Sequence, residues 1–407
     1  MPTSAWSNRY ASRADRFAVS EIRELLKLLD QPDIISFAGG IPDPELFDPA
    51  AMQRAYDRIL ADPVRAKQAL QYASSEGYPP LRAWLAAHMR SLGVLCDADN
   101  ILITNGSQQG LDFVGKLFVD RGDTVLVNGP TYLGGLQAFN AYEPDYDTLP
   151  EPGSNRTPES YRGPGKRPRL IYAMADFRNP SGRCMTRQER LDLLALAEAL
   201  DVPVVEDNAY AHLRYDGEAV PSLTALHLNG RHIDEGRCLY LGTFSKSIAP
   251  GLRLAWICAP RAVIETLVMV KQGADLQSST LNQIAMADVL PEIYEEQVAR
   301  SIATYRTRRD TMLEALARHM PTEAHWSKPE GGMFLWVTLP QGVDTAALLK
   351  RAVELKVAFV PGAAFFTDRS QHNHLRLSFS RATPEQIETG IARLGQLCRE
   401  AVAARAA

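Results

Sequence analysis

The chain has 407 residues, of which 45% are hydrophobic and 23% are charged, and its net charge at pH 7 is −4. This length exceeds one ordinary hydrophobic core, so a large domain plus a smaller one is predicted. The charges are mixed and form no long basic block, which argues against a nucleic-acid partner and favours a small molecule. The five cysteines form no Cys-x-x-Cys pair, so we expect neither a disulfide framework nor a zinc site, and a cytoplasmic location.

The N-terminal region is predicted to be an arm followed by an amphipathic helix. Residues 1–17 contain no apolar run of signal-peptide length, and no membrane-spanning stretch is visible in the sequence. From Ser20, a plausible N-cap, apolar residues recur at helical spacing: Ile22, Leu25, Leu26 and Leu29. We expect the arm before this helix to lie outside the main core.

The central part of the chain alternates short apolar runs with segments of helical period. The runs span residues 101–104, 124–127, 170–174, 202–206, 238–242 and 254–259. A capping box, Thr186-x-x-Glu189, starts a predicted helix over residues 187–200. This alternation predicts an α/β domain with a mostly parallel sheet, in which ligands bind beyond the carboxyl ends of the strands.

The C-terminal part shows a different order of predicted helices and strands. A long helical stretch over residues 294–319 precedes predicted strands near 333–338, 358–360 and 374–379. We therefore predict an N-terminal arm and helix (1–45) that join the small domain, a large domain (46–290) and a small α+β domain (291–407).

Lys246 is the residue with the most distinctive surroundings. It follows an apolar run, among small and hydroxyl residues, with Arg253 downstream. A desolvated pocket or a nearby cation would lower the pKa of such a lysine toward neutrality, although a lysine judged alone is more often a solvated loop residue. The segment matches the long pattern Ser-x-Ser-Lys-x-x-x-Pro-Gly-Leu-Arg, except that Thr243 replaces the first serine. It resembles the cofactor-lysine motif of fold-type I aminotransferases that depend on pyridoxal 5′-phosphate (PLP).

This resemblance extends over nearly the whole chain and implies a fold-type I PLP-transferase. The expected architecture is a large domain with a mostly parallel seven-stranded sheet plus a smaller α+β domain. Lys246 would carry PLP as a Schiff base. The turn after the run 101–104, before a helix expected from Leu111, would present amides and a hydroxyl to an anion. An ordinary strand–helix cap is the alternative; in the family register this turn and the lysine loop hold the phosphate, with Gly106, Ser107, Gln108, Thr243, Ser245 and Arg253.

Three further residues resemble contacts of the PLP ring. Tyr132, after the turn Asn-Gly-Pro, would stack on the pyridine, although an isolated tyrosine is more often packing. Asp207 resembles the aspartate that pairs with the pyridine nitrogen, and Tyr210 the donor to the phenolic oxygen. The acidic pair ending in Asp207 would also suit Mg²⁺, but no phosphate-binding loop motif accompanies it.

Asn179 resembles the family asparagine that shares the phenolic oxygen with Tyr210 and faces the substrate; alternatively, it is simply part of an Asn-Pro turn. The same motif departs from the family, because Ala175 replaces a usual proline and Arg178 a usual glutamine. Arg376, on a strand face opposite to apolar neighbours, resembles the clamp for the substrate α-carboxylate, although alone it would be assigned to solvent.

The remaining predictions concern the dimer and the substrate. Tyr72 begins a segment that resembles the one reaching the neighbouring subunit's phosphate, which implies a homodimer with shared active sites. The N-terminal motifs are similar to the 2-aminoadipate/kynurenine aminotransferase branch, where Ser20 and Arg23 would meet the distal substrate group and Gly40 would line the pocket. Arg23 could instead belong to the polar face of its helix. His372 and His374 have no third ligand in the sequence nearby, so no metal is expected.

The resemblance thus implies ping-pong transamination of an α-amino acid (2-aminoadipate-like, aliphatic or aromatic) with 2-oxoglutarate. Two alternatives stay open. One is another PLP reaction, such as a β-lyase, racemase or decarboxylase, on the same fold. The other is a non-catalytic ligand-sensing domain, although the first 20 residues are too few for a DNA-binding helix-turn-helix domain.

Overall fold

The computed structural model describes residues 6, 9–16, 33–151 and 153–406. The helix predicted after Ser20 lies outside these residues, as do Ser20 and Arg23 themselves. None of the described helices is long and apolar enough to cross a membrane.

A seven-stranded sheet forms the centre of the larger part of the molecule. Its order is β2-β8-β7-β6-β5-β3-β4, and only β8 runs antiparallel to its neighbours. The strands are β2 (Ile101–Thr104), β3 (Thr124–Val127), β4 (Asp145–Thr148), β5 (Pro168–Ala173), β6 (Val204–Asp207), β7 (Cys238–Thr243) and β8 (Ala255–Cys258). The mostly parallel seven-stranded sheet is thereby confirmed.

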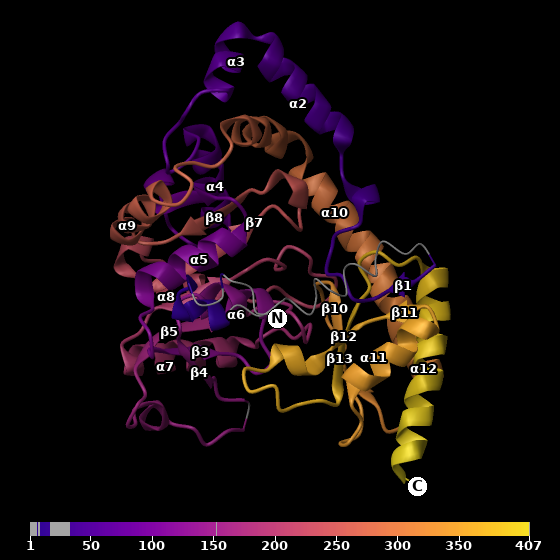
Figure 1. Ribbon diagram of the computed structural model, residues 1–407. Coiled ribbons are helices and arrows are strands. Elements are labelled where there is room, and N and C mark those ends of the chain that lie inside the picture. Colours follow the sequence, from indigo (N-terminus) through magenta and orange to yellow (C-terminus); the bar gives the residue numbers. More distant parts are fainter. Residues whose placement is uncertain (1–5, 7–8, 17–32, 152, 407) are drawn as a thin grey trace.

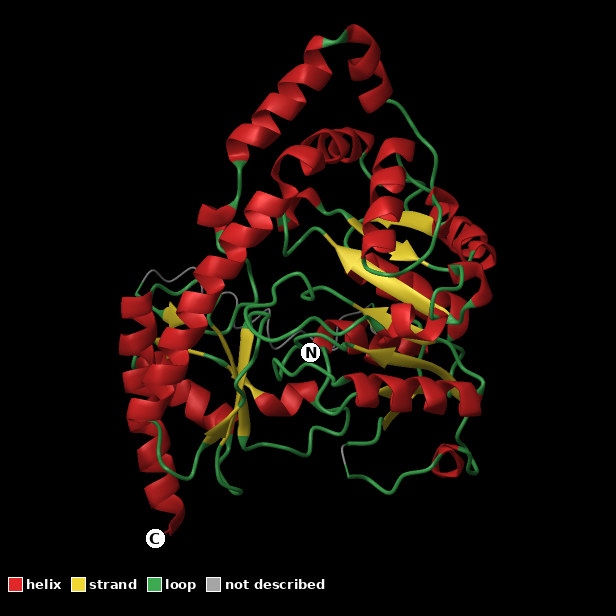
Figure 2. Ribbon diagram, turned by 180° about the vertical axis from the view of Figure 1, so that it is seen from behind, coloured by secondary structure: helices red, strands yellow, loops and turns green. Residues whose placement is uncertain are grey.

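Most strands of this sheet are buried on both faces, as their near-continuous apolar runs require. Helices cover the two sides of the sheet (Figures 1 and 2). These are α4 (Pro79–Ser91), α5 (Ser107–Phe118), α6 (Leu133–Asn140), α7 (Arg187–Leu200), α8 (Leu223–Leu228) and α9 (Arg261–Gln272). Helix α7 has the predicted bounds and capping box. Helix α5 begins at Ser107 rather than Leu111, because the turn itself forms its first helical turn.

The smaller part has a four-stranded sheet in the order β12-β13-β10-β9. Its strands are β9 (His325–Trp326), β10 (Phe334–Thr338), β12 (Val360–Pro361) and β13 (His374–Ser378). A separate pair joins β1 (Ile35–Ser36) to β11 (Val357–Ala358) in parallel. This pair brings the start of the described chain beside the C-terminal part, together with α11 (Thr345–Glu354) and α12 (Pro384–Ala406).

Helix α10 (Thr280–His319) connects the two parts. It begins well before the predicted start at residue 294 and continues through Pro291, so the expected domain boundary at 290 falls inside it. It packs against α12 at one end and against α2 (Pro49–Ala61), α3 (Pro63–Ala69) and α4 toward the other. In Figure 1 it runs from the large sheet toward the C-terminal helix. The division into three segments stays a prediction.

Candidate active site

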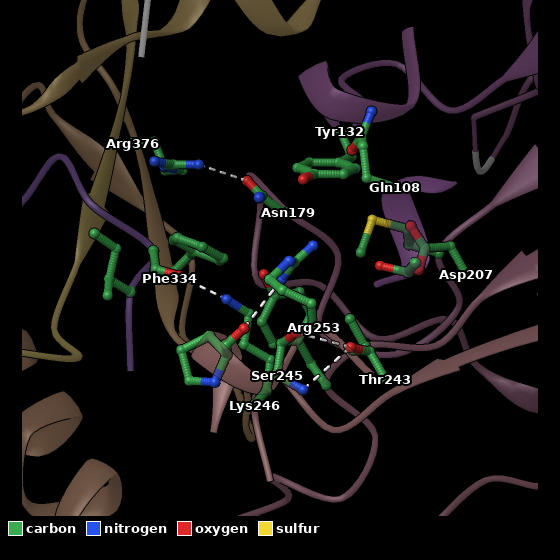
Figure 3. Close-up of a pocket in the computed structure, with 17 residues that line it drawn as sticks. Gln108, Tyr132, Asn179, Asp207, Thr243, Ser245, Lys246, Arg253, Phe334 and Arg376 are labelled. Carbon is green, nitrogen blue, oxygen red and sulfur yellow. Dashed lines mark hydrogen bonds between the residues drawn. The ribbon is translucent and has the colours of Figure 1, made fainter. Parts of the chain in front are cut away.

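A cavity of about 280 Å³ lies where the carboxyl ends of β5, β6 and β7 meet β10 and β13 of the small sheet (Figure 3). The structure brings twelve of the predicted residues to its wall: Gly40, Ser107, Gln108, Tyr132, Asn179, Asp207, Tyr210, Thr243, Ser245, Lys246, Arg253 and Arg376. These residues come from segments up to 336 positions apart (Gly40 to Arg376). The edge of the sheet and the small sheet therefore create the site together.

Lys246 follows the end of β7, and its Nζ donates a hydrogen bond to the Gly40 carbonyl oxygen at 2.9 Å. Burial of the amine, together with the positive charges of Arg376 and Arg253, lowers the pKa of Lys246 to about 8. About a tenth of this amine is therefore neutral at pH 7, far more than for an ordinary lysine, and a neutral amine is what nucleophilic attack and proton abstraction require.

Asp207 is the last residue of β6. Its Oδ2 accepts a hydrogen bond from the Tyr172 hydroxyl at 2.8 Å, whereas its buried Oδ1 has no hydrogen-bond partner among the described residues. Burial raises the pKa of this carboxyl to about 6, against the opposing effect of the Tyr172 hydrogen bond. A buried carboxylate oxygen without a partner is costly, so it calls for a donor inside the cavity.

The opposite end of the cavity is suited to an anion. Gly106 takes a φ of +85° before the first turn of α5, and a Cβ at this position would overlap the Arg253 guanidinium. Arg253 donates to the Asn105 carbonyl oxygen at 3.3 Å, and the Thr243 and Ser245 hydroxyls bond each other at 2.9 Å. Gly106 itself does not line the cavity; its lack of a side chain lets the arginine reach the helix N-terminus.

Arg376 is only 2% exposed, although its sequence pattern alone pointed to solvent. Its Nη1 donates to Asn179 Oδ1 at 2.8 Å and its Nη2 to the Ala38 carbonyl oxygen at 2.5 Å. The guanidinium carbon lies 4.4 Å from the centre of the Phe334 ring. The segment around Ala38 covers the face of β13 that carries Arg376. Burial lowers the pKa of the arginine to about 10, so the guanidinium remains charged at neutral pH.

Two aromatic residues complete the walls. Tyr132 precedes α6, and burial raises its pKa to about 12, so its phenol is neutral at physiological pH. Tyr210 hydrogen-bonds Asn179 and meets the Phe334 ring edge-on at 5.7 Å between centroids. Burial raises the pKa of Tyr210 as well, so it can act as a hydrogen-bond donor.

Sequence reasoning missed several residues of the site. Tyr172, which holds Asp207, and five lining residues were not singled out: Ile41, Met174, Ala209, Pro250 and Phe334. No local signal marks Tyr172, because its contact with Asp207 depends on the pairing of β5 with β6, in which Tyr172 lies opposite Val205. For Phe334 there was none either, since its role follows from contact with Gly40, far away in the chain.

Tyr72 and Arg178 lie elsewhere. Tyr72 is 78% exposed and does not line this cavity. Arg178 is buried but lines a neighbouring cavity instead. Within the described residues, no group of three or more His, Cys, Asp or Glu side chains could hold a metal ion.

The groups at the cavity fit PLP. Lys246 offers an amine for its aldehyde, the unpartnered Asp207 Oδ1 offers an acceptor for its ring nitrogen, and the α5 N-terminus with Arg253 offers donors for its phosphate. The acceptor at one end and the donors at the other are thus complementary to one phosphorylated pyridine.

Comparison with known proteins agrees with this chemistry. The chain is 41% identical over 408 residues to aromatic-amino-acid aminotransferase 1 of Thermococcus litoralis, covering 98% of this chain and 96% of the relative. It is also 41% identical over 398 residues to the 2-aminoadipate transaminase of Thermus thermophilus, covering 97% and 98%. The crystal structure of Pyrococcus horikoshii kynurenine aminotransferase, in complex with PMP, superposes with a TM-score of 0.90 at 38% identity, covering 98% of each chain. The sequence model of the family aminotransferase class I and II matches residues 33–394. The chain therefore belongs to this family and is a PLP-dependent aminotransferase.

Proposed function

We propose that this aminotransferase moves the amino group of a 2-aminoadipate-like, aliphatic or aromatic α-amino acid to 2-oxoglutarate by a ping-pong mechanism. The single observation that carries the proposal is the placement of the Lys246 amine, the Asp207 carboxylate and the Arg376 guanidinium around one cavity. The range of donors is supported by relatives named for aromatic amino acids, 2-aminoadipate and kynurenine.

PLP, when bound, supplies a ring that accepts electrons from the substrate's α-carbon and stores the amino group between the two half-reactions. Lys246 would hold it covalently, Ser107, Gln108, Ser245 and Arg253 would hold its phosphate, and Asp207 would keep its ring nitrogen protonated. Asn179 and Tyr210 would donate to its phenolic oxygen, with Tyr132 against its ring.

The chain's own residues then act on the amino acid. Arg376 would bind the α-carboxylate through its planar fork, because the guanidinium is buried, charged and held by Asn179 and Ala38. This fixes the substrate with its α-hydrogen near Lys246. The released Lys246 Nζ would take the proton from the α-carbon and return it at a different atom, and the apolar wall of Phe334 would help to exclude water.

The test uses purified holoenzyme and one amino donor at a time, without any oxo acid. We expect 2-aminoadipate, leucine or kynurenine to bleach the visible band of the bound cofactor and to yield one oxo acid per active site. Release of ammonia and pyruvate would instead identify a lyase, and a band unchanged by every donor would contradict transamination of these substrates. With 2-oxoglutarate added, parallel lines in double-reciprocal plots are expected for a ping-pong enzyme.

Attachment of PLP to the apoprotein is expected to depend on pH. Because only the neutral Lys246 amine attacks an aldehyde and its pKa is about 8, the attachment rate should rise about tenfold per pH unit below pH 8 and level off above it. Stopped-flow absorption measures this rate. Arg376→Gln should move the midpoint upward, because it removes a positive charge that lowers the pKa of Lys246. A pH-independent rate between pH 6 and 9 would contradict the assignment.

We also propose a homodimer in which Tyr72 of one subunit reaches the other subunit's cofactor phosphate; the 78% exposure of Tyr72 is compatible with this role. Subunit mixing tests it. Lys246→Ala and Tyr72→Ala chains, refolded together in equal amounts, should regain roughly a quarter of the wild-type activity, since half of the dimers would contain one intact site. No recovery above the two separate variants would place Tyr72 in its own subunit's site or outside any site.

A further inference from the structure

A second cavity, of about 410 Å³, lies beside the active site at the edge of the large sheet, between the ends of β3 and β4 and helix α7. These elements lie close together in Figure 1. Its wall includes Arg178, one of the residues at which the sequence departs from the family pattern that it resembles. Arg178 directly precedes Asn179, which faces the active site, so the two side chains of one turn serve two different cavities.

Arg178 is a buried cation that contacts no carboxylate of the described residues directly, although the charges of Glu151 and Glu189 act on it from a distance. It is 3% exposed, its Nε is buried without a hydrogen-bond partner, and it forms no ion pair within the part of the chain that the structure describes. The other two arginines of this wall are paired: Arg183 with Glu189, and Arg156 with Asp147 at 2.9 Å. Burial lowers the pKa of Arg178 only to about 10, so the guanidinium is charged at neutral pH.

The backbone of the turn that carries Arg178 is held by hydrogen bonds. The Arg178 N–H donates to the Arg183 carbonyl oxygen at 2.9 Å, and the Arg178 carbonyl accepts from the Gly182 N–H at 2.6 Å. The side chain starts from this turn and is buried at the cavity wall. A buried charge of this kind is strongly unfavourable unless an anion compensates it.

We propose that this cavity is an accessory binding site for a small organic monocarboxylate with an apolar body, held by Arg178. A carboxylate matches the planar fork of one guanidinium. The apolar side chains of Leu149, Met185, Leu193 and Leu196 suit the body of such a ligand. A doubly charged phosphate is disfavoured, because Glu151, Glu189 and Asp192 line the same cavity and, among its described arginines, only Arg178 lacks an ion pair.

The test is calorimetric titration of holoenzyme with 4-methylpentanoate, which has neither an amino nor an oxo group and cannot react. Two binding sites per chain are expected: one at Arg376 in the active site, and one at Arg178. Ala195→Trp should fill the second cavity from its exposed position on α7 and weaken that site at least tenfold. Ala199→Trp, exposed on the same helix but outside the cavity wall, should leave both sites intact.

Arg178→Gln, which restores the usual family residue, should abolish the same site as Ala195→Trp, whereas Arg376→Gln should abolish only the other. Loss of the Arg376 site alone would concern the active site and the proposed function. Loss of the Arg178 site would concern only the accessory cavity. A single equivalent in wild type, or retention of both sites by Ala195→Trp, would overturn the accessory site. Displacement of 4-methylpentanoate from this site by equimolar inorganic phosphate would overturn its assignment to monocarboxylates.

Discussion

Replacing Lys246 with alanine is expected to lower kcat for transamination by at least about 10⁴-fold, the upper end of what a positioned general base contributes. The variant would lose both the proposed covalent anchor and the proposed carrier of the α-proton, and no other lysine among the described residues lines the cavity. PLP should still bind through its phosphate and ring contacts, with a visible spectrum shifted to that of the free aldehyde. Rapid-quench measurement of oxo-acid formation in a single turnover measures the proton-transfer defect directly.

Two controls make this result specific. Lys116→Ala, an exposed lysine on α5, should keep wild-type kcat within about twofold, because surface substitutions away from a site have small effects. Added methylamine should partly restore the single turnover of Lys246→Ala, since a small amine can occupy the vacated space and accept the proton. Turnover of Lys246→Ala close to wild type would remove Lys246 from the chemistry altogether.

Sequence patterns were sufficient wherever residues close together in the chain determine the structure. The capping box of Thr186 and Glu189 set the start of α7, and the parallel strands were recognised because burial on both faces demands uninterrupted apolar runs. The lysine loop was recognised because many residues in one short segment match one pattern. The turn at Gly106 was recognised as well, although its helix was expected to begin later than it does.

The rest depended on contacts that a linear pattern does not carry. Strand alternation alone would assign Arg376 to solvent, and only the family resemblance pointed to a substrate clamp, because nothing near it in sequence reveals that the segment around Ala38 covers that face of β13. Likewise, Phe334 gains its role from Gly40, at which any Cβ would overlap its ring. The 2-aminoadipate-specific contacts expected of Ser20 and Arg23 lie outside the described residues and stay a prediction.

Asp207→Asn is expected to raise the stability of the apoprotein at pH 7 and to lower the activity of the holoenzyme. In the apoprotein, Oδ1 of Asp207 is buried without a partner among the residues that the structure describes, and burial raises the pKa of the carboxyl from 3.8 to about 6. The folded state thus binds this proton more tightly than the unfolded state. The stability of the wild-type apoprotein should therefore fall as the pH rises from about 4 to about 6, and stay lower above that range. The neutral asparagine can still accept from Tyr172, so the variant apoprotein should melt at a higher temperature at pH 7.

The same change should lower kcat of the holoenzyme by about 10²- to 10³-fold, as expected when one charge that stabilises a transition state is removed. An amide cannot keep the ring nitrogen of PLP protonated, so the ring becomes a poorer electron acceptor. Glu206→Gln is the matched control, because the neighbouring carboxylate accepts from the Leu223 and Thr224 amides at 2.9 Å, away from the cavity. It should keep kcat close to that of the wild type, because the Glu206 side chain does not line the cavity. If Asp207→Asn lowers both apoprotein stability and activity, the carboxylate is a structural group; if it raises the first and lowers the second, the strain of a buried unpaired charge is part of how this chain prepares its cofactor site.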